Sequence, residues 1–192
     1  KDELSGETFE VRPQVLINAG GAWIDQVNER LNRSTHYIGG TKGSHLIIDN
    51  ADLYEAVDDK MIFFENLDNR ICIMFRLHGK VMVGSTDIRV DSPDDVTTSP
   101  EDIAYMLESV RQVFPSINLK KEQVVFHYCG VRPLPNSSDS RTGAISRDHS
   151  FQIMPPDSNN QFPVYSLVGG KWTTFRAFAE QTKSDLRALA AC

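Results

Sequence analysis

The sequence predicts an α+β fold, in which a mostly antiparallel sheet with flanking helices is joined to elements of an α/β layer. Three observations predict it. Apolar runs with a tight His-Gly-Lys turn fill residues 61–86, which is typical of an antiparallel meander. A strand followed by Gly-Gly and a helix occurs near each end, in LINAGGAW (16–23) and SLVGGKWTTFR (166–176). Apolar residues at helical spacing mark residues 103–114.

The strands are predicted from short apolar runs bounded by turn residues. The first, residues 15–18, follows a turn near Pro13 and leads into a helix in which Trp23, Val27 and Leu31 recur every four residues. The remaining strands are expected at 42–49, 61–64, 70–77, 80–86, 122–134, 151–154 and 163–168.

Two further helices have clear boundaries. Ser99 and Pro100 supply an N-cap and a first-turn proline, the acidic residues that follow suit a helix N-terminus, and Pro115 ends the helix. Residues 171–191 are expected to form a long final helix. The polar stretch 135–143 is the segment most typical of a loop.

Composition limits the classes of partner. The 192 residues are 40% hydrophobic and 24% charged, with a formal net charge of -6, so nucleic acid is not an expected partner and any anion site must be local. No run of 18 apolar residues occurs. Three widely spaced cysteines and five histidines without ligand spacing predict reduced thiols and no metal site.

The candidate functional residues are two glycine turns and several cations. Gly20-Gly21 and Gly169-Gly170 stand where a strand meets a helix N-terminus, a place suited to an anionic ligand. Cations and a histidine stand at strand ends or loop entries, namely Lys42, His45, Arg132, Arg147 and Lys171. The residues alone leave plainer alternatives open: Gly-Gly as a turn, each arginine as solvated, and His45 as structural.

The order of six motifs resembles the FAD-dependent glycerol-3-phosphate dehydrogenases, within the D-amino-acid-oxidase-like flavoproteins. The motifs are VLINAGGAW, TKGSH, VGSTD, GVRPL, ISRDH and GGKWTTFR, over residues 9–190. Three positions depart from the family pattern, which usually has Pro at Ala22, Leu at Trp172 and Tyr at Phe175.

The resemblance implies that the chain is an internal fragment. No GxGxxG unit for the FAD pyrophosphate is present. The implied division is a partial FAD-binding segment (1–36), a substrate-binding domain around the antiparallel sheet (37–125), and a return to the FAD domain with the terminal helix (126–192). The N-terminal FAD-domain half of the same chain would be a missing partner, and the fragment alone is expected to be inactive and to bind FAD weakly.

The resemblance also implies an activity: oxidation of sn-glycerol 3-phosphate to dihydroxyacetone phosphate, with hydride transfer to FAD and electrons passed to a quinone. His45 and Lys171 would be catalytic, and Arg132, Arg147 and Lys42 would bind substrate. Cofactor contacts are implied for Gly20, Gly21, Trp23, Gly169, Gly170, Lys171, Thr173 and Thr174. Asp87 matches a family position, with either a site role or a structural role open.

Two alternatives remain. A flavin-dependent amine or amino-acid oxidase of the same superfamily would use an arginine to bind a carboxylate, although two arginines and Lys171 suit phosphate better. A non-catalytic binding module would keep the sheet without the chemistry. The expected location is the cytoplasm, with peripheral attachment to the inner membrane as a further option for the full-length enzyme.

Overall fold

The computed structural model describes residues 1–138 and 145–190, the side chains of 188–190 excepted. Contacts divide the chain into two compact units, which are described separately. The terminal unit comprises Lys1–Tyr37 and Asp148–Cys192, and the central unit comprises Ile38–Arg147. The functional division into 1–36, 37–125 and 126–192 stays a prediction.

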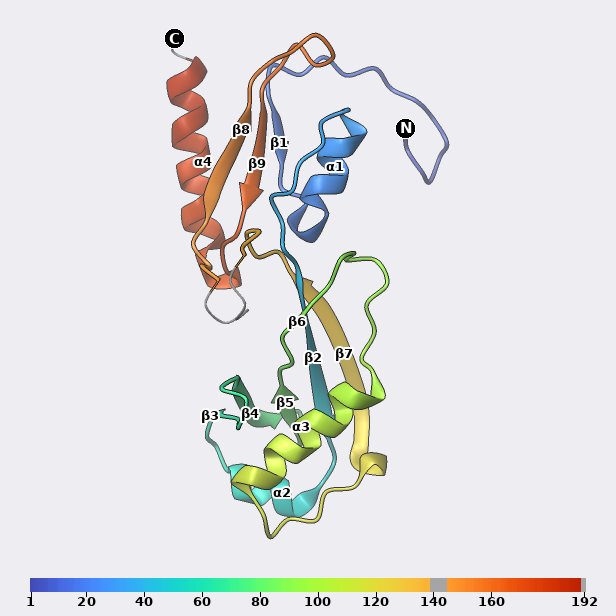
Figure 1. The fold of residues 1–192 in the computed structure, drawn as a ribbon, viewed down its shortest axis with the longest axis vertical. Coiled ribbons are helices and arrows are strands. Elements are labelled where there is room, and N and C mark those ends of the chain that lie inside the picture. The colour runs from blue at the N-terminus through green and yellow to red at the C-terminus, as the bar shows by residue number, and fades with distance from the viewer. Residues whose placement is uncertain (139–144, 191–192) are drawn as a thin grey trace. The chain divides into compact units, whose positions relative to one another are not determined.

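The terminal unit contains a three-stranded sheet in the order β1-β9-β8 (Figure 1). Strand β1 (Leu16–Asn18) pairs in parallel with β9 (Val164–Val168), and β8 (Ser150–Met154) pairs antiparallel with β9. A 3-10 turn, η1 (Gly21–Trp23), and helix α1 (Ile24–Arg30) follow β1. The turn η4 (Trp172–Thr174) and helix α4 (Phe175–Ala190) follow β9 in the same way.

The central unit is built on an antiparallel sheet in which β2 (Thr41–Ile48) pairs with β5, β6 and β7. The strand order is β3-β4-β5-β2-β6, and β7 pairs with β2 off this path. The other strands are β3 (Ile62–Glu65), β4 (Ile71–Leu77), β5 (Lys80–Gly84), β6 (Ile88–Arg89) and β7 (Val124–Arg132). The antiparallel meander predicted for residues 61–86 is therefore confirmed.

Helices α2 (Ala51–Val57) and α3 (Pro100–Val113) cover one face of this sheet, and η2 (Lys121–Gln123) leads into β7 (Figure 1). Alternation along the strands points half of their side chains toward these helices. The core consists of Leu46, Ile48, Leu53, Val57, Met74, Val81, Val83, Ile103, Met106, Leu107, Val110 and Leu119.

The predicted start and end of α3 are confirmed. Ser99 Oγ accepts a hydrogen bond from the Asp102 backbone N–H at 3.2 Å, and Asp102 Oδ2 accepts one from the Ser99 N–H at 3.0 Å. The helix ends just before Pro115, as its missing N–H requires. Helix α2 was not predicted, because its seven residues offer only Leu53 and Val57 as buried positions and so give little periodicity.

The structure confirms the fold class: the chain is mixed α+β, with mostly antiparallel sheets and a parallel β1–β9 pair. The expected loop 135–143 lies largely outside the described residues, as does the predicted end of the final helix at residue 191. Within 1–138 and 145–190, no helix is long and apolar enough to cross a membrane.

Candidate functional site

The sheet of the central unit has two chemically different faces. On β2, Lys42, Ser44 and Leu46 point toward the helices, whereas Gly43 and His45 lie on the opposite face. Directly paired residues of an antiparallel sheet share a face. We call this second face the His45 face; its members are Thr41, Gly43, His45 and Ile47 of β2, Phe126, Tyr128, Gly130 and Arg132 of β7, and Met82 and Gly84 of β5.

Arg132 lies on the His45 face with its guanidinium held on several sides. Its Nη1 donates hydrogen bonds to the Thr86 carbonyl oxygen and to Asp87 Oδ1, both at 3.2 Å, and its Nη2 donates to Ser85 Oγ at 2.5 Å. A Cβ on Gly43 would lie 2.5 Å from Arg132 Cζ, so the guanidinium occupies the space that a side chain at residue 43 would fill. The glycine is thus needed for Arg132 to lie flat on the strand.

Arg132 is half-buried, and its pKa depends on this burial and on two charged neighbours. Burial lowers the pKa of Arg132, the Asp87 carboxylate opposes this, and the charge of Arg147 lowers it further. The influence of Arg147 on Arg132 indicates that the structure brings these two predicted substrate arginines near each other. Arg147 itself is exposed, at the end of the central unit.

His45 is the neighbour of Arg132 on the same face. Its ring stacks on Tyr128, with 4.9 Å between ring centroids and 8° between planes. The ring also covers Gly84, where a Cβ would lie 2.6 Å from His45 Nε2. Burial lowers the pKa of His45, and the charge of Arg132 lowers it further, so the imidazole is neutral at pH 7. Its Nδ1 is buried and has no hydrogen-bond partner among the described residues.

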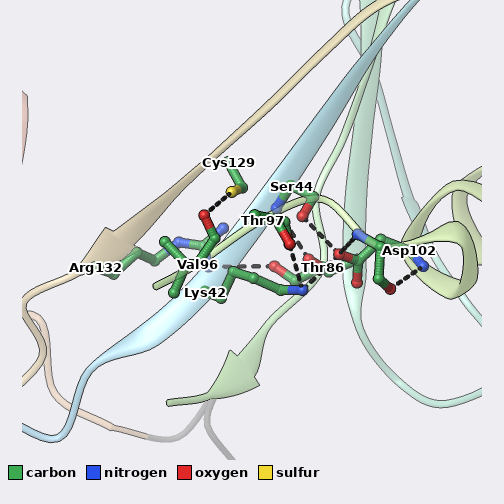
Figure 2. Close-up of polar contacts among 9 residues, drawn as sticks. Lys42, Ser44, Thr86, Val96, Thr97, Asp102, Cys129 and Arg132 are labelled. Carbon is green, nitrogen blue, oxygen red and sulfur yellow. Dashed lines mark hydrogen bonds and ion pairs between the residues drawn. The ribbon is translucent and has the colours of Figure 1, made fainter. Parts of the chain in front are cut away.

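Lys42 points toward Asp102 on the helix-covered face of the sheet (Figure 2). Arg132 and His45 lie on the opposite face. Its Nζ lies 2.6 Å from Asp102 Oδ2 and donates to the Thr97 carbonyl oxygen at 3.1 Å. Ser44 Oγ donates to the same carboxylate oxygen at 3.0 Å. Lys42 was predicted to bind substrate, and the structure places it instead in a buried ion pair that joins β2 to α3.

The two glycine turns lie at one edge of the terminal sheet. Because β1 and β9 are adjacent and parallel, their carboxyl ends point the same way, and Gly20-Gly21 and Gly169-Gly170 follow those ends. Gly21, Gly169 and Gly170 have positive φ of 58°, 81° and 90°, which glycine adopts without strain. The two predicted junctions thus belong to one sheet.

A buried amide network fixes the first turn. Asn18 Oδ1 accepts the Gly20 N–H at 3.1 Å, and Asn18 Nδ2 donates to the Ile24 carbonyl oxygen and to Asn28 Oδ1. Asn28 in turn donates to Ser166 Oγ on β9 at 3.1 Å. Since Asn18, Asn28 and Ser166 are at most 2% exposed, these bonds tie β1, α1 and β9 into one rigid unit.

The second turn is held by its own residues. Thr174 Oγ1 accepts the Lys171 N–H at 3.0 Å and donates to the Lys171 carbonyl oxygen at 3.1 Å, so this hydroxyl shapes the turn. The Lys171, Trp172 and Thr173 side chains are exposed, Trp172 at 93%. Trp23, in the first turn, is 44% exposed.

Sequence reasoning missed several partners of the predicted residues. For Asp87 the sequence leaves a site role and a structural role open, and no local pattern singles out Ser85, Gly43, Gly84 or Tyr128. Pairing register supplies the missing information, because Tyr128 and Gly84 become neighbours of His45 only once β2 is placed between β7 and β5. In the part of the chain that is described, no group of three or more histidine, cysteine or acidic side chains is placed to hold a metal ion.

Comparisons with known proteins give the family of this chain. The model of the family "FAD dependent oxidoreductase" matches residues 2–181. Glycerol-3-phosphate dehydrogenase of Synechocystis sp. is 34% identical, covering 94% of this chain and 34% of the relative. D-erythritol 1-phosphate dehydrogenase of Brucella abortus is 30% identical, covering 95% of this chain and 36% of the relative. This chain therefore spans about a third of the length of these relatives.

A solved structure is also similar over nearly the whole chain. Glycerol-3-phosphate dehydrogenase from Bacillus halodurans, solved with FAD, has a TM-score of 0.77 and 26% sequence identity, covering 99% of this chain and 35% of that one. With the family match over residues 2–181, these similarities identify the chain as a member of the FAD dependent oxidoreductase family.

Proposed function

We propose that this chain is part of an FAD-dependent dehydrogenase that oxidises sn-glycerol 3-phosphate to dihydroxyacetone phosphate. The observation that carries the proposal is the placement of the Arg132 guanidinium beside a neutral His45 on one sheet face, with the charge of Arg147 acting on Arg132. Cations for a phosphoester and a proton acceptor for an alcohol are the groups that this reaction requires.

The residues of the terminal unit fit a flavin nucleotide. Around Gly21, no atom lies within 4 Å of the position that a Cβ would take, and its positive φ exposes backbone that a ligand can approach closely. Gly169 and Gly170 give the second turn the same left-handed backbone, before the 16-residue helix α4. We propose that Gly20, Gly21, Trp23, Gly169, Gly170, Lys171, Thr173 and Thr174 contact the flavin.

The residues of the central unit then have separate tasks. Arg132 and Arg147 bind the phosphate, Arg132 through an N–H fork that suits a phosphoryl group and Arg147 through its exposed side chain. His45, neutral at pH 7, accepts the proton of the C2 hydroxyl as C2 loses a hydride. Bound FAD supplies the acceptor for that hydride. Lys171 is the second candidate for the proton transfer, and a quinone is the proposed final electron acceptor.

Lys42 is excluded from this set. Its ammonium group already contacts Asp102 and the Thr97 carbonyl oxygen, and it is buried on the opposite face of the sheet from His45. We propose that it stabilises the central unit and makes no substrate contact.

The named relatives support a phosphorylated polyol as the substrate class, since one is named for glycerol 3-phosphate and another for D-erythritol 1-phosphate. The full-length protein should be assayed for reduction of a quinone analogue with each of these compounds and with glycine. Turnover of glycerol 3-phosphate supports the proposal, preference for D-erythritol 1-phosphate changes the substrate, and turnover of glycine alone indicates an amino-acid oxidase.

Arginine variants test the phosphate contacts in the same assay. Changing Arg132 or Arg147 to Ala should lower kcat/KM for glycerol 3-phosphate about tenfold or more, equivalent to about 1.4 kcal/mol of transition-state binding. Arg111, an arginine of helix α3 that contacts Glu108 and the Leu119 carbonyl oxygen, serves as the control variant. Kinetics equal to those of the control would remove the tested arginine from the site.

The same proposal extends to the whole protein, namely its FAD binding, its further segment and its location. The 192-residue chain alone should bind FAD weakly and show no turnover, which flavin fluorescence titration measures. A further segment of the same chain would supply the nucleotide-binding half, as the coverage of about a third of the relatives suggests. We propose a cytoplasmic location with peripheral membrane attachment, to be tested by fractionation.

A further inference from the structure

The loop that follows β5 surrounds the guanidinium of Arg132. Three consecutive residues contact it: Ser85 through its hydroxyl, Thr86 through its carbonyl oxygen and Asp87 through its carboxylate. Together they engage three of the five N–H donors that an arginine carries, which leaves donors for an anion. The Arg132–Asp87 ion pair is well shielded, since the two side chains are 26% and 15% exposed.

We propose that Asp87 is a positioning residue, which holds Arg132 in the orientation that binds the substrate phosphate. The inference rests on the proposed function. An unrestrained arginine has many rotamers, and a guanidinium that is already fixed loses less conformational entropy on binding. Asp87 removes this freedom in advance, because it accepts from Nη1 while the Gly43 backbone lies under the same group.

The position of Asp87 is itself fixed by the sheet. Thr86 is 1% exposed, and its Oγ1 accepts the Ser44 backbone N–H at 2.9 Å. Ser44 Oγ donates to the buried carboxylate of Asp102 (Figure 2). A continuous set of bonds therefore runs from the start of α3 through β2 to the loop that holds Arg132.

Charge alone would act in the opposite direction. If Asp87 only neutralised Arg132, its removal would leave a stronger cation, and anions would bind more tightly. Positioning predicts the reverse, that anions bind more weakly once the guanidinium is released. The sign of the change in KM therefore separates the two roles.

The test uses the full-length enzyme with Asp87→Ala, Asp87→Asn and Asp87→Glu. We expect Asp87→Ala to raise KM for glycerol 3-phosphate about tenfold, with a smaller change in kcat. Asp87→Asn keeps the accepting Oδ1 and should restore KM to within about threefold of the wild type, whereas Asp87→Glu keeps the charge, moves the carboxylate and should raise KM. The inhibition constant of inorganic phosphate should change in parallel with KM.

Asp49→Ala is the matched control, because it removes an exposed ion pair with Lys80 in the same unit and should leave KM unchanged. A lowered or unchanged KM in Asp87→Ala would overturn the inference, and so would an Asp87→Asn variant as impaired as Asp87→Ala. If Asp87→Ala does not fold, the Asn and Glu variants decide the question by themselves.

A second measurement separates this inference from the proposed function. Phenylglyoxal labelling of Arg132, followed by mass spectrometry, reports how freely the guanidinium moves without any substrate. We expect faster labelling in Asp87→Ala and Asp87→Glu than in the wild type and in Asp49→Ala. If the wild-type enzyme oxidises no glycerol 3-phosphate, the proposed function fails, and equal labelling rates would still refute the positioning role.

Discussion

The structure makes Gly43 the most informative single position in the central sheet. A methyl group at residue 43 would lie 2.5 Å from Arg132 Cζ, whereas carbon contacts ordinarily begin near 3.5 Å. The Arg132 guanidinium must therefore move by about 1 Å or more in Gly43→Ala. Because this group is the end of a flexible side chain, it can move without disturbing the backbone of β2 or β7.

The expected loss of kcat/KM follows from this displacement of the guanidinium. The Arg132 guanidinium would leave its hydrogen bonds to Ser85, Thr86 and Asp87, and a misplacement of about 1 Å in a binding group can cost about 100-fold in rate. We expect kcat/KM for glycerol 3-phosphate to fall between about 10-fold and 100-fold, equivalent to about 1.4–2.7 kcal/mol. The melting temperature should change little, since the advantage of alanine over glycine in a strand, about 0.5–1 kcal/mol, offsets much of the loss of these hydrogen bonds.

Gly130→Ala provides a matched control. Gly130 pairs directly with Gly43 across β2 and β7, and no atom lies within 4 Å of its Cβ position. Steady-state kinetics of the two variants in the full-length enzyme, with melting temperatures measured alongside, test the reasoning. A kcat/KM for Gly43→Ala equal to that of the wild type would refute it, because the Arg132 guanidinium would then have no need of its place over residue 43.

Three further predictions concern buried and half-buried ionisable groups. Asp102→Ala leaves the Lys42 ammonium buried without its carboxylate and should destabilise the full-length protein by about 3–5 kcal/mol, whereas the double variant Lys42→Met/Asp102→Leu should recover much of this in thermal unfolding. Burial raises the pKa of Asp102, but hydrogen bonds from Lys42, Ser99 and Ser44 outweigh it and lower the pKa overall. The stabilisation by Asp102 is therefore present above the unfolded pKa of about 3.9 and is lost as pH falls through the lower folded pKa. If the wild-type protein were as stable at pH 3 as at pH 6, this prediction would be wrong. For His45, burial and the Arg132 charge lower the pKa, so kcat/KM should fall toward acid pH with a midpoint below about 6.5. This fall should be absent in His45→Gln. A midpoint at or above about 6.5 would show that the imidazole is not held neutral in this way.

Local patterns of the sequence were sufficient to predict most of the helices and strands. The antiparallel strands of the meander, the cap and end of α3, and the two strand–glycine–helix junctions all follow from residues that are neighbours in the chain. Turn chemistry, capping and the alternation of apolar residues act over a few positions, so they can be recognised without knowledge of the fold. Helix α2 escaped because seven residues are too few for a periodic pattern.

The sequence by itself determined which residue types gather near the ends of strands, including Arg132, His45 and the paired glycines, and its ordered motifs indicated the family. The tertiary structure alone decided which of these side chains share a surface. Lys42 and His45 are three residues apart in the same strand, yet the two-residue period of β2 points one into an ion pair with Asp102 and the other toward Tyr128 and Gly84. Likewise, Gly43 meets Arg132 through the pairing of β2 with β7, and Asp87 reaches it because β5 and β6 also pair with β2. Contacts between distant residues depend on register, which local sequence does not specify.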